Sequence, residues 1–150
     1  MEILKVEGLD KDFTMLCEQL EEFQFNMIPI LREKDYSLTK DLEKVTGFVL
    51  YDNKKPIGSI GLKKSSDDTC EIVRVFISED YRGNGYAGIL FEKIESFAKD
   101  CGFTRVEMVA WCKAKSALRL YEKLDYNKSE EKISEWFGGS KYVELYKDLK

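Results

Sequence analysis

The spacing of hydrophobic residues changes from segment to segment along the chain, and each spacing predicts a type of secondary structure. Apolar residues at intervals of three and four predict helices, whereas short alternating runs predict strands. In the first half this gives a strand at 2–7, a helix at 11–25, a hairpin of strands 47–52 and 56–63 with its turn at 53–55, and a strand at 70–77. The expected core of the hairpin is Val49, Tyr51, Ile57 and Ile60. A second helix is expected to start near Pro29, although 31–44 is weakly patterned and also fits a loop.

The second half has a sharper pattern. A turn cluster at 78–85 precedes a helix at 87–101 that Gly102 ends, and a strand at 105–111 and a short helix at 117–124 follow. Further strands are expected at 141–146 and, less regularly, at 128–133. The strand, helix and strand between 70 and 111 predict a right-handed parallel crossover in a sheet that is antiparallel elsewhere. We therefore expect an α+β (mixed α/β) fold, built as one domain over residues 1–150.

Composition narrows the class of protein. With 43% hydrophobic and 35% charged residues, the chain is typical of an ordered globular domain. Its 24 basic and 28 acidic residues give a net charge of −4, which argues against a nucleic-acid partner. No apolar run is long enough for a membrane span, and the acidic start is unlike a signal peptide. These features predict a cytoplasmic protein with no membrane partner.

The chain has no histidine, which limits its chemistry. A Ser-His-Asp triad, a histidine metal site and a histidine base are excluded, so proton transfer must use carboxylate, Tyr, Lys, Cys or water. The cysteines at positions 17, 70, 101 and 112 form neither a CxxC pair nor a zinc spacing. We expect them to be reduced and mostly buried, with no metal site.

A glycine-rich turn lies between the strand at 70–77 and the following helix. In such a turn, backbone N–H groups and the helix dipole favour an anion, and glycines let a phosphate approach the main chain. Gly83, Gly85 and Gly88 also satisfy G-x-G-x-x-G, with Glu107 about 20 residues further on, as in a dinucleotide-binding fold. However, residues 78–82 separate the strand from the first glycine and a hairpin precedes the motif, so the context is wrong for that fold. A purely structural turn remains the other alternative.

Two runs carry a family resemblance. The stretch from Glu71 to Ala87 resembles the acyl-CoA motif of the GCN5-related N-acetyltransferases (GNAT), whose signature is Arg or Gln, two residues, Gly, one residue, and Gly or Ala. The run Leu120-Tyr121-Glu122-Lys123-Leu124-Asp125-Tyr126 is similar to a second run of that family. The resemblance spans about 47–127. It departs at Ala114, where an Asn is usual, and at Asp125, where a Gly is usual.

The resemblance implies that acetyl-CoA lies where the strands at 70–77 and 105–111 splay apart, with no metal involved. Backbone groups of Val75, Phe76 and Ile77 would pair with the pantetheine arm, and an N–H near Phe76 could polarise the thioester carbonyl. The implied diphosphate-binding residues are Arg82, Gly83, Asn84, Gly85, Tyr86, Ala87 and Gly88.

It also implies two catalytic residues. Glu71 is the candidate base, acting directly or through water, and the alternatives are a solvent-facing strand glutamate or a water chain that suffices alone. Tyr121 is the candidate acid for the departing thiolate, and the alternative is an aromatic that packs in the core. Cys70 and Cys112 lie beside the predicted cleft, and buried hydrophobic packing is the simpler interpretation of both.

The implied activity is acetyl-CoA-dependent N-acetylation of a primary amine, most simply on a small cationic molecule, by direct attack on the thioester. A non-catalytic acyl-CoA-binding or sensor module and a protein N-terminal or lysine acetyltransferase remain alternatives. Phe23, Phe25 and Tyr36 could form a lid over the acceptor or pack equally well in the core. The C-terminal aromatics Trp136, Phe137, Tyr142 and Tyr146 could cover a homodimer contact or belong to the core.

Overall fold

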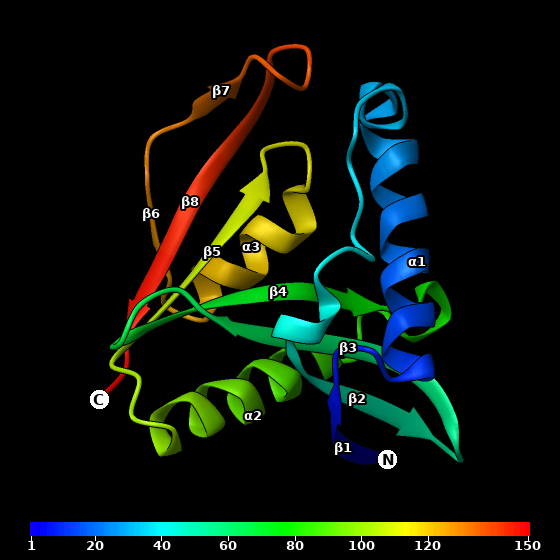
Figure 1. Cartoon of the computed structure of the whole chain (residues 1–150), viewed down its shortest axis with the longest axis vertical. Helices are drawn as coiled ribbons and strands as arrows, with labels where there is room; N and C mark the ends of the chain where they lie inside the picture. The colour runs from blue at the N-terminus through cyan, green and yellow to red at the C-terminus, as the bar shows by residue number, and fades with distance from the viewer.

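The computed structural model describes residues 1–150 and is built around one eight-stranded sheet (Figure 1). The strand order is β1-β2-β3-β4-β5-β8-β6, and β7 also pairs with β8. The strands are β1 (Glu2–Glu7), β2 (Thr46–Asp52), β3 (Lys55–Lys64), β4 (Thr69–Ile77), β5 (Arg105–Trp111), β6 (Asn127–Lys128), β7 (Lys132–Ser134) and β8 (Ser140–Asp148). Only β4 and β5 pair in parallel, which confirms the predicted α+β sheet.

The helices cover the two faces of this sheet separately. They are α1 (Lys11–Met27), α2 (Tyr86–Asp100) and α3 (Lys115–Lys123), with short 3-10 helices η1 (Pro29–Glu33), η2 (Leu42–Lys44) and η3 (Glu79–Tyr81). One hydrophobic cluster includes residues of α1, and the larger cluster includes residues of α2 and α3. In Figure 1, α1 accordingly lies on the near side of the sheet and α2 on the other. The chain runs from the end of β4 through η3 and the glycine turn directly into α2.

The α-helix expected to start near Pro29 does not form, and the alternative of a loop is what residues 34–41 adopt. Pro29 begins only the 3-10 helix η1, and residues 34–41 form a loop. In this stretch Leu31, Leu38 and Leu42 are the buried residues, and charged and hydroxyl side chains separate them. No continuous apolar stripe is therefore present to hold a longer helix on the sheet.

The strands predicted at 128–133 and in the hairpin have different outcomes. The candidate strand at 128–133 is replaced by the short strands β6 and β7, which are separated by 129–131. The hairpin at 46–64 is confirmed, and its turn residues Asn53 and Lys54 both have positive φ, as tight hairpin turns require. Val49, Ile57 and Ile60 are buried as predicted, whereas Tyr51 is only half-buried.

No helix in the structure combines the length and apolar character that a membrane crossing requires.

Candidate active site

The site is a gap in the sheet between β4 and β5. These strands pair only from Thr69 with Arg105 to Glu71 with Glu107, and beyond that pair they diverge. β5 continues to pair with β8 along its whole length, so the separation leaves one side of β5 and the facing side of β4 without a strand partner. Figure 1 shows β4 and β5 opening as a V. Unpaired backbone groups on a strand edge can bind an extended chain.

The glycine turn lies beside this gap and offers a row of free donors. No amide from Gly83 to Gly88 donates to a group within the chain. Gly85 caps α2 with φ of +78° and no side-chain hydrogen bond, so the amides of the first turn stay open. A Cβ built at Gly83, Gly85 or Gly88 would meet no atom within 4 Å. The first turn of α2 thus presents exposed, unpaired amides of the kind that can hold an anion, and its glycines are not explained by packing inside the chain.

Arg82 and Asn84 stabilise the turn from within. The Arg82 amide donates to Glu79 at 3.2 Å, and its Nε donates to the Ile77 carbonyl at 2.8 Å. Its guanidinium lies 4.5 Å from the centre of the Phe23 ring on α1. The Asn84 side chain donates to the Tyr81 carbonyl at 3.1 Å. These contacts leave only the terminal guanidinium nitrogens of Arg82 free for a ligand, so its main contribution is to shape the turn.

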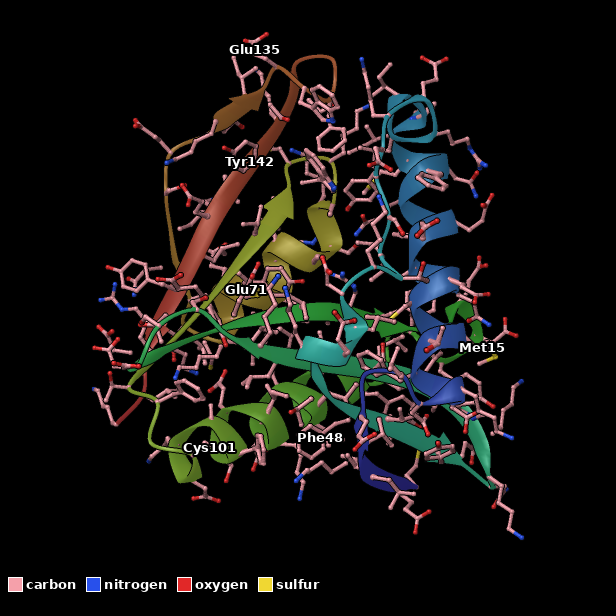
Figure 2. All side chains as sticks on the ribbon, in the orientation of Figure 1. Met15, Phe48, Glu71, Cys101, Glu135 and Tyr142 are labelled. Atoms are coloured by element: carbon pink, nitrogen blue, oxygen red, sulfur yellow. The ribbon has the colours of Figure 1, made fainter.

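Glu71 lies where the two strands begin to separate (Figure 2). Its side chain is about one third exposed, and Lys63 Nζ is 3.6 Å from its Oε1. Glu107 is its register partner on β5, which places two carboxylates on the same face at the narrow end of the gap. Cys70 and Val106, which alternate with them, are buried in the cluster on the opposite face. Glu71 and Glu107 therefore belong to the α1 side of the sheet.

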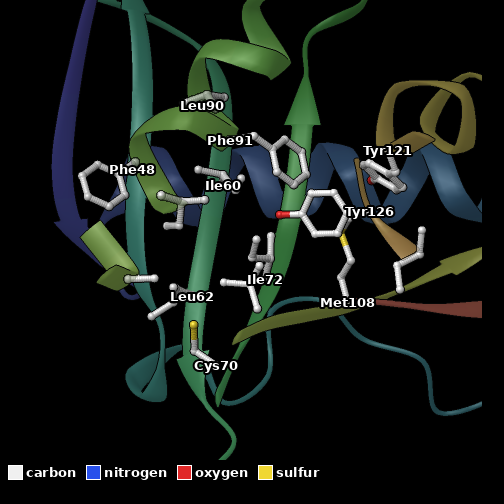
Figure 3. Close-up of a cluster of buried hydrophobic side chains, with 14 of the residues drawn as sticks. Phe48, Ile60, Leu62, Cys70, Ile72, Leu90, Phe91, Met108, Tyr121 and Tyr126 are labelled. Carbon is white, nitrogen blue, oxygen red and sulfur yellow. The ribbon is translucent and has the colours of Figure 1, made fainter. Parts of the chain in front are cut away.

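Tyr121 projects from α3 into the larger hydrophobic cluster (Figure 3). Its ring centre is 5.6 Å from that of Phe91 and 6.3 Å from that of Tyr126. Burial raises the pKa of Tyr121 to about 12, so the hydroxyl stays protonated at neutral pH. Tyr126 donates to Glu95 at 2.7 Å, whereas no hydrogen bond to the Tyr121 hydroxyl is found within the chain. Tyr121 is therefore both a core aromatic and a protonated group with a free donor.

The two departures from the family pattern lie at the ends of α3. Ala114 caps the helix without a side-chain hydrogen bond. Asp125 has φ of +67° just past the C-terminal end, the position where glycine is common. Asp tolerates left-handed backbone better than most residues, and the Tyr126 amide still donates to the Tyr121 carbonyl at 3.0 Å. The change at Asp125 therefore leaves the helix end intact.

An aromatic cluster spans the open end of the gap on the α1 side. The Tyr36 ring lies 6.3 Å from Phe25, 6.2 Å from Trp111 and 5.3 Å from Phe137, measured between centres. Trp111 also contacts Tyr142 at 6.3 Å. Tyr36 and Phe25 thus pack in this aromatic cluster, whereas Phe23 is exposed and contacts Arg82 instead.

The bulge in β4 is a feature of the site that the sequence analysis missed. Ser59 pairs with Phe76 and Gly61 with Val73, so two residues of β4 lie opposite Ile60. Arg74, one of the two, has φ of +58°. A single buried serine in an apolar strand, Ser59, was the available signal.

The cysteines lie mainly in the core. Cys17, Cys70 and Cys112 are buried and Cys101 is exposed. Burial raises the pKa of Cys17 and of Cys70 to about 12, which keeps these thiols protonated. Neither Cys70 nor Cys112 has a feature that would make it a nucleophile.

A mixed sheet with one splayed parallel pair, and an open helix N-terminus beside the splay, defines a domain of the acyl-CoA-dependent transferase type. The sequence model of the acetyltransferase (GNAT) family matches residues 13–126. The chain belongs to the GNAT acetyltransferase family.

Solved structures agree on the fold. A protein from Klebsiella pneumoniae subsp. pneumoniae MGH 78578, provisionally named an acyl-CoA N-acyltransferase, aligns with a TM-score of 0.78 at 18% identity, over 99% of this chain and 97% of that one. An aminoglycoside 6'-N-acetyltransferase in complex with coenzyme A aligns at 0.76 and 13% identity, over 100% and 98%. A GNAT acetyltransferase from Elizabethkingia anophelis with acetyl-CoA bound aligns at 0.74 and 15%, over 99% and 97%. Homologues with this fold bind acetyl-CoA or coenzyme A.

Proposed function

We propose that this acetyltransferase moves the acetyl group of acetyl-CoA to the primary amine of a small cationic molecule, by direct attack of the amine on the thioester. The observation that carries the proposal is the uninterrupted row of free amides from Gly83 to Gly88 at the start of α2, next to the gap between β4 and β5. A diphosphate suits such a row, because its charge favours the positive end of the helix and its oxygens accept from the amides.

The other proposed contacts to acetyl-CoA lie in the gap between β4 and β5. Val75, Phe76 and Ile77 lie on the part of β4 beyond its pairing with β5, where their backbone groups would pair with an extended arm of the donor. A backbone N–H near Phe76 would donate to the thioester carbonyl as negative charge develops there. Acetyl-CoA, when bound, supplies the activated acyl group.

Two side chains would move protons. Glu71 would accept a proton from the incoming ammonium, directly or through water, because an amine must be neutral to attack. Tyr121 would donate its proton to the departing sulfur, because its hydroxyl is protonated at neutral pH and its donor is not used within the chain. With no histidine in the chain, a carboxylate and a phenol are the candidates for the two tasks.

A cationic acceptor is supported by charge. Glu71 and Glu107 are side by side on the face from which the amine would enter, and the chain carries a net charge of −4. Opposite charge concentrates a cationic ligand near such a face.

The test is the release of free thiol from acetyl-CoA in the presence of four amines: spermidine, kanamycin, L-lysine and a dipeptide with a free N-terminus. We expect saturable release with spermidine or kanamycin, and acetylated amine confirmed by mass spectrometry. Fastest turnover with the dipeptide would instead favour a protein N-terminal acetyltransferase. Tight acetyl-CoA binding with no release for any amine would favour a binding module.

A further inference from the structure

Arg74 holds a strained position in the middle of β4. Its φ of +58° is uncommon for any residue other than glycine, and it lies in the bulge where residues 74 and 75 face Ile60. Strained backbone persists only where surrounding contacts fix it, and such positions cluster at functional sites. The contacts that fix Arg74 therefore indicate what the bulge does.

Two hydrogen bonds fix this residue. Ser59 is fully buried, and its hydroxyl donates to the Arg74 carbonyl at 2.9 Å. The Arg74 side chain donates from Nε to the carbonyl of Leu38 at 2.8 Å. The second bond leaves the sheet and reaches the loop at 34–41, so the strained residue connects β4 to that loop.

Leu38 is held on its other side as well. Its amide donates to Glu21 Oε2 on α1 at 2.7 Å, and its side chain is buried in the same cluster as Val73 and Phe76. Both backbone polar groups of Leu38 are thus occupied, one by α1 and the other by Arg74. Without the guanidinium, its carbonyl has no other partner in the structure.

The same loop reaches the opposite strand. Tyr36 accepts a hydrogen bond from the indole Nε1 of Trp111 at 3.4 Å, and the two rings lie 6.2 Å apart. Trp111 is the last residue of β5. Residues 36–38 therefore cross the gap on the α1 side, attached to β4 through Arg74 and to β5 through Trp111.

We infer that Arg74 is a positioning residue that holds the 34–41 loop across the gap and so fixes the wall along which the acceptor amine reaches the thioester. This inference rests on the proposed function, because the loop is an acceptor wall only if an amine enters from this face. The hydrogen bonds of Arg74 join it to Ser59 and Leu38 and not to the glycine turn, so the bond to Leu38 should affect the acceptor and not the affinity for acetyl-CoA.

A matched pair of substitutions isolates that hydrogen bond. In Arg74→Gln the side-chain amide nitrogen lies as many bonds from Cα as Nε does, so a donor is retained without the charge. In Arg74→Met a side chain of similar length has no donor. Both variants place a residue other than glycine at the same positive φ, so the cost of backbone strain is similar in the two. Lys54→Met is the control, because Lys54 also has positive φ but lies in the exposed turn between β2 and β3.

For Arg74→Met we expect the KM of each amine that the parent protein acetylates to rise about 3- to 10-fold, the range for loss of one hydrogen bond, with the Kd of acetyl-CoA unchanged. Amide hydrogen exchange in the 34–41 loop should rise by a similar factor. Arg74→Gln and Lys54→Met should match the parent protein in all three measurements.

Three results would overturn the inference. Unchanged exchange and KM in Arg74→Met would show that the loop does not depend on this bond. Equal losses in Arg74→Gln and Arg74→Met would assign the effect to charge. A rise in the Kd of acetyl-CoA would indicate a general structural role. If the parent protein acetylates no amine, the proposed function fails and the acceptor role of Arg74 fails with it. If the parent protein is active and Arg74→Met behaves identically, only the inference about Arg74 is refuted.

Discussion

Gly85 allows a direct test of where the diphosphate binds. It caps α2 with φ of +78°, and a Cβ there would meet no atom of the chain. Asn and Asp can therefore be placed without a clash, and both tolerate left-handed backbone better than other residues. They have nearly the same shape and differ in charge. A comparison of Gly85→Asp with Gly85→Asn thus separates the charge at this position from its bulk.

Helix α1 has an N-cap whose side chain occupies the first free amides of the helix. Asp10, at the start of α1, accepts hydrogen bonds from the amides of Asp12 and Phe13, each at 3.1 Å. Gly85 makes no such bond, so the amides at the start of α2 are left for a ligand. In both variants a side chain would lie among these donors, and both should therefore bind acetyl-CoA more weakly than the parent.

The expected magnitudes follow from strain and Coulomb energy. Left-handed backbone at a residue other than glycine costs about 1 to 2 kcal/mol, and this cost should be nearly equal in the two variants. A carboxylate about 4 Å from one phosphate charge is repelled by about 1 kcal/mol in water and about 4 kcal/mol at an effective dielectric constant near 20. The Kd of acetyl-CoA should therefore be about 5-fold to several hundred-fold higher for Gly85→Asp than for Gly85→Asn.

The assay is calorimetric titration with acetyl-CoA at about 50 mM and about 500 mM salt. The ratio of the two Kd values should shrink at high salt, because screening shortens the reach of the added charge. Gly102→Asp and Gly102→Asn are the controls, since Gly102 has φ of +92° and equally open surroundings at the other end of α2. They should lose stability without a change in binding. Equal affinities of the two Gly85 variants at low salt, with both folded, would refute the placement of the diphosphate at this helix end.

Further predictions concern groups away from the turn. Tyr121→Phe should lower kcat about 100-fold or more with the Kd of acetyl-CoA unchanged, measured by thiol release and calorimetry. Burial raises the pKa of Tyr121 from 10.0 to about 12, so the stability contributed by its protonated hydroxyl is intact below pH 10 and is lost as pH rises toward 12. Between pH 10 and pH 12 the free energy of unfolding, measured with urea, should therefore fall by about 3 kcal/mol less in Tyr121→Phe than in the parent protein. A thiol reagent at pH 8 should label Cys101 alone in the folded protein, because burial raises the pKa of Cys70 to about 12, and reaction of a second thiol would contradict the packing. Glu95→Ala removes the carboxylate that pairs with Lys147 at 2.9 Å and accepts from the buried Tyr126 hydroxyl at 2.7 Å, and should lower the free energy of unfolding by about 2 kcal/mol without affecting acetyl-CoA binding.

The glycine turn proposed to hold acetyl-CoA could be predicted because neighbouring residues in the sequence form it. The Gly83 and Gly85 positions require positive φ, and they follow a strand and precede a helix that apolar spacing alone identifies. The turn, the helix start and the free amides therefore come from one continuous stretch of chain. A short sequence window contains everything that this arrangement needs.

The bulge in β4 could not be predicted in the same way. Apart from Arg74, every residue from Ile72 to Ile77 is apolar, because this part of β4 packs against a cluster on each face of the sheet. A strand buried on both faces has no alternation that reports its register. An inserted residue therefore leaves the hydrophobic pattern unchanged, and only the paired register of β3 and β4 reveals it.

The acceptor side depends on contacts between segments far apart in the chain. Leu38 is fixed by Glu21 and Arg74, and Tyr36 by Trp111, so the position of the loop is set by three elements that no single window includes. The proposed site for acetyl-CoA uses backbone amides instead, which any sequence with the same turn presents. Substitutions in the 34–41 loop can therefore alter the wall facing the amine while the amides at α2 remain in place. This separation gives a physical reason why one fold can keep acetyl-CoA as its donor and still differ in its acceptor.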